Sequence, residues 1–209
     1  MTTRSRVIPT RVETPAAGPA GAPPEIAAEA RPHRELRDAD GISATVPDWS
    51  REAKPLFAWM PSRSLLASLR AHQRLASSRN PLHAVLRTLA VLRHRFWSVV
   101  TGADIPLGCR IAGGLLLPHP NGVVIHCDVE IGPNCLILQQ VTIGVGHGGV
   151  PRLGGHVDVG AGAKVLGNIQ VGDHAAIGAN AVVLKDIPPG AVAVGIPAVV
   201  VRSGLSKPC

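Results

Sequence analysis

Aromatic residues are scarce in this chain of 209 residues, which has three Trp, two Phe and no Tyr. A globular core built on large aromatic rings is therefore not expected. No run of about 18 apolar residues is long enough to span a membrane, and the first thirty residues lack the compact apolar segment of a secretion signal. We therefore expect a cytoplasmic protein that has no membrane partner.

Cysteine is also rare, and its spacing contains no CxxC motif of the kind that binds zinc or exchanges disulfides. The four cysteines are Cys109, Cys127, Cys135 and Cys209. We interpret them as reduced and mostly structural thiols, in keeping with a cytoplasmic location.

Acidic residues are fewer than basic ones, 14 against 21, so the formal net charge is +7. Arginines concentrate ahead of residue 100, at Arg63, Arg70, Arg74, Arg79, Arg87, Arg93 and Arg95. Neither interleaved aromatics nor a recognised nucleic-acid-binding motif accompanies them. We expect a solvated helix face and no nucleic-acid partner.

The most informative feature that is present is a period of six residues. Aliphatic residues recur at Leu153, Val159, Val165, Val171, Ile177 and Val183. A second apolar series, offset from the first, runs through Val157, Ala163, Ile169, Ala175, Ala181 and Ile187. The period is neither the two of a strand nor the 3.6 of a helix, so it predicts a repeat architecture. Three six-residue sides make an eighteen-residue triangular coil, and coils of this kind stack into one continuous core.

The period is interrupted at two places. Upstream, the series runs in steps of six from Ile105 to Val129 and then shifts by two to Ile131, which predicts two extra residues in a corner there. Between Ile143 and Leu153 the step is ten. Four extra residues, within the glycine-rich stretch from Val145 to Arg152, are therefore expected to leave the coil as a loop.

Two amphipathic helices are predicted ahead of the repeat. The first follows Ser62, a candidate N-cap, and carries Leu65, Leu66, Leu69 and Leu75 on one stripe. The second begins at Asn80-Pro81 and ends at Thr101-Gly102. Its apolar face comprises Leu82, Val85, Leu86, Leu89, Leu92, Phe96 and Val99 or Val100. We divide the chain into a disordered segment 1–54, an α-helical region 55–102, a repeat domain 103–200 and a C-terminal tail 201–209.

A helix pair leading into hexapeptide repeats resembles the serine O-acetyltransferases of the left-handed β-helix acyltransferase superfamily. The resemblance covers residues 80–200 and is carried by Asp104-Ile105, LLLPHPNGVVI (115–125), QQVTIG (139–144), VGAGAKVLGNIQVG (159–172) and VGIPA (194–198). It implies a mainly β protein, a left-handed parallel β-helix preceded by a short α-helical region. It also implies acetyl-CoA as co-substrate, L-serine as the favoured acceptor, a role in cysteine biosynthesis, and a homotrimer, or a dimer of such trimers, with active sites between subunits.

The chemistry that this resemblance implies needs a base. A serine hydroxyl is too weakly acidic to attack a thioester near neutral pH, and an imidazole with a pKa of about 6.5 can remove its proton. His119, between two prolines, matches the family's general base, and Asp104, fifteen residues earlier, matches the carboxylate that orients it. An ideal eighteen-residue coil would offset the two by three residues along the sheet, about 10 Å.

Positions matched to the family also suggest how the substrates are held. Small residues at Gly144, Ala161, Gly162 and Ala179 would line the pantetheine arm, and Lys185 would meet a phosphate of the coenzyme. The family's Arg-His pair for the acceptor aligns with Gly149 and Val150, so His147 or Arg152 takes its place as acceptor-binding residue. Arg152 would bind a carboxylate in bidentate fashion.

Three alternatives remain open. The missing Arg-His pair favours an acetyltransferase for a sugar or another small hydroxyl acceptor. A zinc enzyme resembling the β-helix carbonic anhydrases would draw its ligands from His119, His126, His147, His156 and His174. These histidines lack the spacing of a ready zinc site, so we expect no metal. The third alternative is a solenoid scaffold without catalysis, which the fold alone does not exclude.

Overall fold

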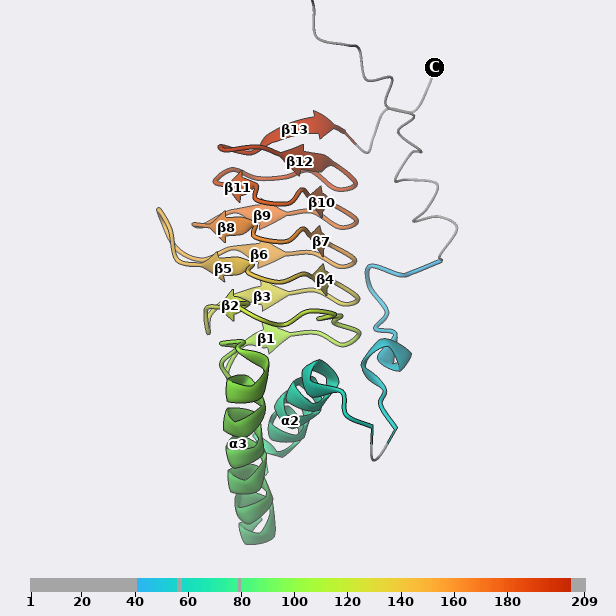
Figure 1. The fold of residues 1–209 in the computed structure, drawn as a ribbon, viewed down its shortest axis with the longest axis vertical. Coiled ribbons are helices and arrows are strands. Elements are labelled where there is room, and N and C mark those ends of the chain that lie inside the picture. The colour runs from blue at the N-terminus through green and yellow to red at the C-terminus, as the bar shows by residue number, and fades with distance from the viewer. Residues whose placement is uncertain (1–40, 56–57, 79, 204–209) are drawn as a thin grey trace, which may run out of the picture. The chain divides into compact units, whose positions relative to one another are not determined.

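The computed structural model describes residues 41–55, 58–78 and 80–203, and it places two helices ahead of a stack of short parallel strands (Figure 1). The helical elements are η1 (Trp49–Glu52), α2 (Pro61–Leu75) and α3 (Pro81–Thr101). The strands are β1 (Arg110–Ile111), β2 (Val124–Ile125), β3 (Glu130–Ile131), β4 (Leu136–Ile137), β5 (Thr142–Gly144), β6 (Arg152–Leu153), β7 (Asp158–Val159), β8 (Lys164–Leu166), β9 (Gln170–Val171), β10 (Ala176–Ile177), β11 (Val182–Val183), β12 (Val192–Val194) and β13 (Val199–Arg202). The mainly β class and the preceding helical region are thereby confirmed.

Three parallel sheets form the three sides of the coil. Their strand orders are β1-β3-β6-β9, β2-β5-β8-β11 and β4-β7-β10-β12, and the antiparallel strand β13 follows β12. Each strand pairs with the strand one coil away, as Leu153 does with Val171 and Ile143 with Val165. The chain therefore builds a β-solenoid, as the six-residue period predicts.

The core consists of the inward aliphatic residues of both predicted series. Ile137, Ile143 and Val165 are wholly buried, and so are Val141 and Ala163, which lie two residues before two of them. Each of the parallel strands β1 to β12 thus contributes one inward side chain, and the residue two positions earlier fills the corner before it, whereas the antiparallel strand β13 buries none of its residues. Small β-branched residues suit this narrow interior because they pack on a pleated surface without needing the space of a ring.

Of the two predicted interruptions of the period, one is confirmed and the other lies at a different place. The step of 22 residues from Ile131 to Leu153, against 18 from Leu153 to Val171, confirms four extra residues in the loop after β5. The predicted position of the two-residue shift is wrong. Val129 is buried, but it belongs to the corner series, and its strand residue is Ile131. The extra pair instead lies between Leu117 and Ile125, eight residues apart, in the corner that carries His119.

The predicted second helix is confirmed with its caps. The Asn80 side chain accepts a hydrogen bond from the Leu82 N–H at 2.9 Å, Pro81 is in the first turn, and Gly102 ends α3 with φ of 66°. The Ser62 cap of the first helix is wrong, because α2 starts at Pro61 and its N-cap is Met60 without a side-chain hydrogen bond. Leu65, Leu66 and Leu69 do join the core.

One arginine departs from the expected solvated face. Arg70 is only 7% exposed, and its guanidinium donates to both carboxylate oxygens of Glu52, at 3.0 and 2.8 Å. It also donates to the carbonyls of Ile111 and Ala112, both at 2.6 Å, in the first coil. Arg70 therefore ties the helical region and the segment around η1 to the start of the solenoid.

The segment before the helices also departs from expectation, because the sequence predicts disorder for residues 41–54 together with residues 1–40. Asn134 accepts a hydrogen bond from the Asp48 N–H at 2.7 Å and donates to the carbonyls of Ser43 and Val46 at 2.7 and 2.8 Å. Residues 41–52 therefore run along one corner of the solenoid. The remainder of the predicted segment, residues 1–40, lies outside the described residues, as do residues 204–209 of the predicted tail.

None of the helices formed by the described residues combines the length and the apolarity that a membrane crossing requires.

Candidate functional site

His119 occupies the widened corner between two sides of the solenoid. The preceding side pairs Leu116 with Leu136, and the following strand is β2. Six residues separate Ile137 from Ile143 at the equivalent corner of the next coil, whereas eight separate Leu117 from Ile125. Because the extra residues cannot follow the inner contour, this corner projects outward and His119 is exposed. An imidazole at this place can reach a ligand that lies along the corner.

Asp104 lies one coil before β2, on the side of the solenoid that β2 also belongs to. It forms a parallel bridge with Val124: the Asp104 N–H donates to the Val123 carbonyl at 2.8 Å, and the Ile125 N–H donates to the Asp104 carbonyl at 2.9 Å. Its side chain is exposed, and among the described residues no hydrogen bond joins it to His119. The coil is twenty residues long here, so the three-residue offset calculated for an ideal coil does not apply.

The corners stacked beyond His119 carry three of the residues expected to line coenzyme A. Backbone hydrogen bonds of 2.8 to 2.9 Å join these corners in series, from Gln140 N to Asn121 O, from Gly162 N to Gln139 O and from Asn180 N to Ala161 O. Ala161, Gly162 and Ala179 therefore lie in one column with His119. Gly162 has φ of 72°, and a Cβ there would collide with Asn180 Oδ1, so the coil itself requires a glycine at this position.

The other predicted binding residues belong to a different corner column, at the far end of the sheet β2-β5-β8-β11. Gly144 ends β5, His147 lies in the loop that follows, and Lys185 follows β11. A side of six residues is about 20 Å long at ~3.3 Å per residue. The chain therefore divides the predicted site residues between two corners about 20 Å apart, and it does not bring them together within one copy.

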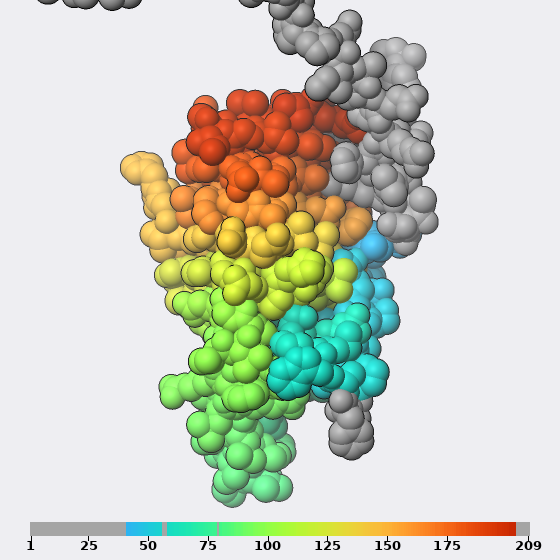
Figure 2. Space-filling model, viewed as in Figure 1, coloured from blue at the N-terminus to red at the C-terminus, as the bar shows by residue number. Residues whose placement is uncertain are grey.

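The loop after β5 is held to its own chain, although it projects from the surface (Figure 2). Gly146 N donates to Gly149 O at 3.0 Å, which closes a tight turn, and Asn168 N donates to His147 O at 3.1 Å. Beyond the loop, Arg152 belongs to β6 and its Nε lies 3.7 Å from Glu130 Oε2. Glu130 also pairs with Arg110 at 2.7 Å, so Arg152 shares this carboxylate with a second arginine.

The five histidines of the zinc alternative are likewise dispersed. His156 and His174 meet on the third corner column, with their Nδ1 atoms 2.9 Å apart, while His119, His126 and His147 lie on the other two columns. Among the described residues, the group whose ligand atoms converge is His126, Cys127 and Asp128, which contains one histidine. A site of three histidines is not formed by the described residues of one copy.

The described cysteines are free thiols. Burial raises the pKa of Cys135 to about 12, and burial, then the neighbouring Cys127 and Asp104, raise the pKa of Cys109 to about 11. Both thiols therefore stay protonated near neutral pH and act as small apolar side chains. This agrees with the structural role predicted for Cys135.

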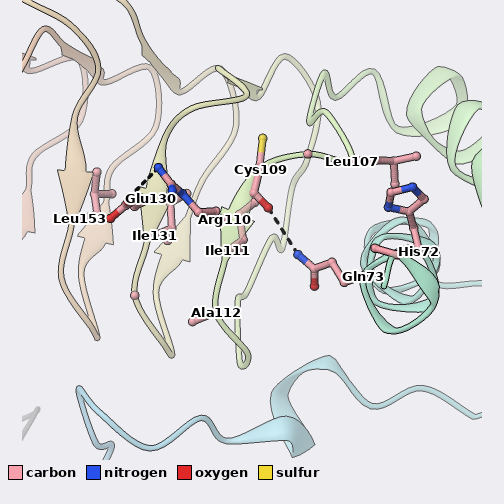
Figure 3. A pocket seen from close by; sticks show the side chains of 13 residues that line it. His72, Gln73, Leu107, Cys109, Arg110, Ile111, Ala112, Glu130, Ile131 and Leu153 are labelled. Atoms are coloured by element: carbon pink, nitrogen blue, oxygen red, sulfur yellow. Dashed lines mark hydrogen bonds and ion pairs between the residues drawn. The ribbon is translucent and has the colours of Figure 1, made fainter. Parts of the chain in front are cut away.

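A cavity of about 820 Å³ lies between α2 and the sheet that begins with β1 (Figure 3). His72 and Gln73 line it from the helix, and Cys109, Arg110 and Glu130 line it from the coils. Gln73 Nε2 donates to the Cys109 carbonyl at 3.4 Å across its floor. None of the predicted site residues lines this cavity, so it is separate from the His119 corner.

The parallel coils with glycine-containing corners place the chain in the class of hexapeptide-repeat β-solenoid proteins. No protein-family model matches it. A serine acetyltransferase of Mycobacterium tuberculosis is 44% identical over 126 residues, 58% of this chain and 54% of the relative. That of Synechococcus elongatus is 47% identical over 113 residues, 51% of this chain and 46% of the relative. The chain spans about half the length of the curated relatives it matches.

The similar solved structures are also serine acetyltransferases, and they cover a larger share of the chain. Ligand-free soybean serine acetyltransferase is 36% identical with a TM-score of 0.51, over 66% of this chain and 69% of that one. A serine acetyltransferase in complex with CoA is 32% identical with a TM-score of 0.58, over 81% and 66%. The chain belongs to the serine acetyltransferase family.

Proposed function

We propose that this chain transfers the acetyl group of acetyl-CoA to the hydroxyl of L-serine, forming O-acetyl-L-serine and coenzyme A in cysteine biosynthesis. The observation that carries the proposal is His119, exposed on the one corner that two extra residues push outward. The relatives support both substrates, since their structures include a complex with CoA and a soybean complex with serine. The free thiols fit the proposed cytoplasmic location.

In this mechanism His119 is the general base. The imidazole accepts the proton of the serine hydroxyl while its oxygen attacks the thioester carbonyl. When the tetrahedral intermediate collapses, the carbon–sulfur bond breaks and the imidazolium returns the proton to the departing sulfur. Asp104 has the role of orienting carboxylate, which stabilises the imidazolium. Hydrogen bonds between catalytic groups are often long before substrates bind, so their separation in the free chain is compatible with this role.

The oxyanion of the intermediate needs hydrogen-bond donors, and the loop after β5 can supply them. The N–H groups of Gly146 and Gly149 are bonded to each other's carbonyls, at 3.0 and 3.4 Å. Among the described contacts of this turn, the N–H groups of His147 and Gly148 are unused. They are the donors that we assign to the oxyanion.

The proposed site requires two copies of the chain, because the loop and His119 lie at opposite ends of one sheet. A neighbouring copy would place its loop over the His119 corner, which supports the predicted homotrimer. In this assembly coenzyme A lies along the column of Ala161, Gly162 and Ala179, and Gly144 and Lys185 approach from the neighbour.

A sugar or another neutral hydroxyl compound is the second candidate acceptor. The observation in its favour is the pairing of Arg152 with Glu130, which leaves His147 as the loop side chain available to a serine carboxylate. A neutral acceptor would need no such cation.

Release of coenzyme A by the purified full chain, followed with a thiol reagent, separates the candidates. With acetyl-CoA present, turnover of L-serine that is lost in His119→Ala and kept in His126→Ala supports the proposal. Turnover with sugars alone supports the second candidate. If the chain neither turns over any acceptor nor binds coenzyme A, the function is that of a scaffold.

A further inference from the structure

The corner between β2 and β3 carries three consecutive side chains of the kinds that bind transition metals, His126, Cys127 and Asp128. Each offers one ligand atom, and these atoms all lie within 4.8 Å of one another. Imidazole nitrogen, thiolate sulfur and carboxylate oxygen are all ligands of Zn²⁺ in proteins. A mixed set of this kind disfavours Mg²⁺ and Ca²⁺, which prefer oxygen ligands.

The separations of these atoms are close to those in a zinc site. His126 Nδ1 lies 3.8 Å from Cys127 Sγ and 3.7 Å from Asp128 Oδ2. With Zn–S of ~2.3 Å and Zn–N or Zn–O of ~2.0–2.1 Å, tetrahedral geometry sets such pairs of ligand atoms about 3.3–3.6 Å apart. Small rotations of the side chains would therefore bring all three onto one ion.

The tautomer of His126 suits a metal ligand. The Asp128 N–H donates to His126 Nδ1 at 3.3 Å, so Nδ1 presents its lone pair and the proton of the neutral imidazole is on Nε2. This hydrogen bond is longer than a typical one from an N–H group. An ion can therefore replace the N–H at Nδ1 at small cost, and the N–H turns to water, because Asp128 is exposed.

The backbone of the corner is fixed on both sides. His126 N donates to Ile143 O at 2.9 Å, and Val129 N donates to His126 O at 3.1 Å, which closes a turn around the three residues. Val129 itself is wholly buried in the core. Behind the turn, Cys109 Sγ donates to His126 O at 3.4 Å. Binding an ion would therefore order side chains only, on a turn that is already formed.

Negative charge gathers at this corner. Burial first, and then the charges of Cys127, Asp104 and Asp128, raise the pKa of Cys109 to about 11. The two carboxylates near this thiol attract a cation. When Cys127 gives up its proton to bind the ion, its thiolate and the Asp128 carboxylate together balance the charge of Zn²⁺.

The solenoid itself does not require these side chains. The positions in register with them on two later coils are residues 166–168 and 184–186, which are Leu-Gly-Asn and Leu-Lys-Asp. Within residues 41–55, 58–78 and 80–203, no other group of three His, Cys, Asp or Glu side chains converges in this way. The needs of the fold therefore do not account for this cluster.

We propose that this corner binds one Zn²⁺ per chain through His126 Nδ1, Cys127 Sγ and a carboxylate oxygen of Asp128. The Cys127 thiol releases its proton to solvent on binding, and water takes the fourth tetrahedral position. The ion has no part in the proposed acetyl transfer, so the site does not depend on that function. For the same reason, His126→Ala leaves the acetyl-transfer rate of the zinc-free chain unchanged.

Zinc binding by the full chain, first stripped of metal with a chelator, tests the proposal. All proteins carry Cys209→Ser, so that this thiol does not contribute. Equilibrium dialysis and metal analysis should find one tightly bound zinc per chain, which Cys127→Ser and His126→Ala lose. The matched control is Asp186→Asn, which changes an exposed carboxylate in the same corner column and should keep the zinc. Absence of tightly bound zinc, zinc retained in Cys127→Ser, or zinc lost from the control would overturn the proposal.

Replacement of zinc by Co²⁺ reports the ligands themselves. A cobalt–thiolate bond gives an intense charge-transfer band in the near ultraviolet. Under anaerobic conditions we expect this band in the Cys209→Ser chain and its loss in Cys127→Ser. Asp128→Asn should need more Co²⁺ to reach the same absorbance, because a neutral amide oxygen is a weaker ligand than a carboxylate. Bound Co²⁺ without the thiolate band, or an Asp128→Asn titration identical to that of the unchanged site, would contradict the proposed ligands.

Discussion

Removal of the Glu52 carboxylate should be among the most destabilising single changes in the helical region. Both members of the Glu52–Arg70 pair have side chains that are 8% exposed, so water screens their attraction little. The Glu52→Ala variant would leave the Arg70 guanidinium buried with only carbonyl and amide acceptors, from Ile111, Ala112 and Gln73. Breaking a buried ion pair by removing one partner costs about 3–5 kcal/mol.

A second loss adds to this cost. Glu52 Oε1 also accepts the Leu115 N–H at 3.1 Å, and an unsatisfied buried N–H costs about 1–3 kcal/mol. We therefore expect Glu52→Ala to lower the free energy of unfolding by about 4–8 kcal/mol. Glu52→Gln should lower it less, because an amide oxygen can still accept from Arg70 and Leu115. The Glu52→Leu, Arg70→Met double variant should recover part of the loss, because it removes both charges.

Urea unfolding followed by circular dichroism, at one fixed protein concentration, measures these changes. The control is Glu130→Ala, which breaks the exposed pair with Arg110, whose side chains are 39% and 69% exposed respectively. Exposed pairs contribute about 0–1 kcal/mol. If Glu52→Ala costs no more than Glu130→Ala, the reasoning from burial is refuted.

Two glycines and one buried histidine allow further tests. A methyl group at Gly144 would meet no atom within 4 Å, so Gly144→Ala should fold normally, and a raised KM for acetyl-CoA would mark it as a binding residue. Gly162→Ala, at φ of 72° and against Asn180, should instead destabilise the fold itself, seen as a lower urea midpoint. Burial lowers the pKa of His94 below its ordinary value of 6.5, outweighing its hydrogen bond to the Ile105 carbonyl. The unfolded chain therefore binds more protons, and stability should fall as pH drops below about 6.5. In paired urea titrations at about pH 7.5 and about pH 5.5, on either side of that value, His94→Gln should lose less stability than wild type, and an equal loss would contradict this origin.

The solenoid could be predicted from sequence because its determinants repeat. Each inward aliphatic residue and each glycine corner recurs every six residues, so a single misread position does not change the fold. The position of the two-residue shift could not be predicted because Val123 and Val129 are as apolar and as buried as the strand residues. Composition does not distinguish a corner residue from a strand residue two positions away.

The contacts of residues 41–52 were not predictable in this way. Asn134 binds this segment through its side-chain amide, and an asparagine in a corner is equally typical of a left-handed turn, which Asn134 also forms with φ of 62°. The division of the proposed site between two corners also could not be predicted from the sequence. His119 and Gly144 are 25 positions apart, and only the strand register shows that they lie at opposite ends of one sheet.

The central claim is that His119 is the base of an acetyl transfer to L-serine. Its most direct test is the initial rate of coenzyme A release from acetyl-CoA and L-serine by wild type, His119→Ala and His126→Ala, which removes a histidine from another corner. General-base catalysis contributes about 10²–10⁴-fold, so His119→Ala should lose that factor in kcat while His126→Ala keeps the wild-type rate. A His119→Ala enzyme that is as active as wild type would contradict the account.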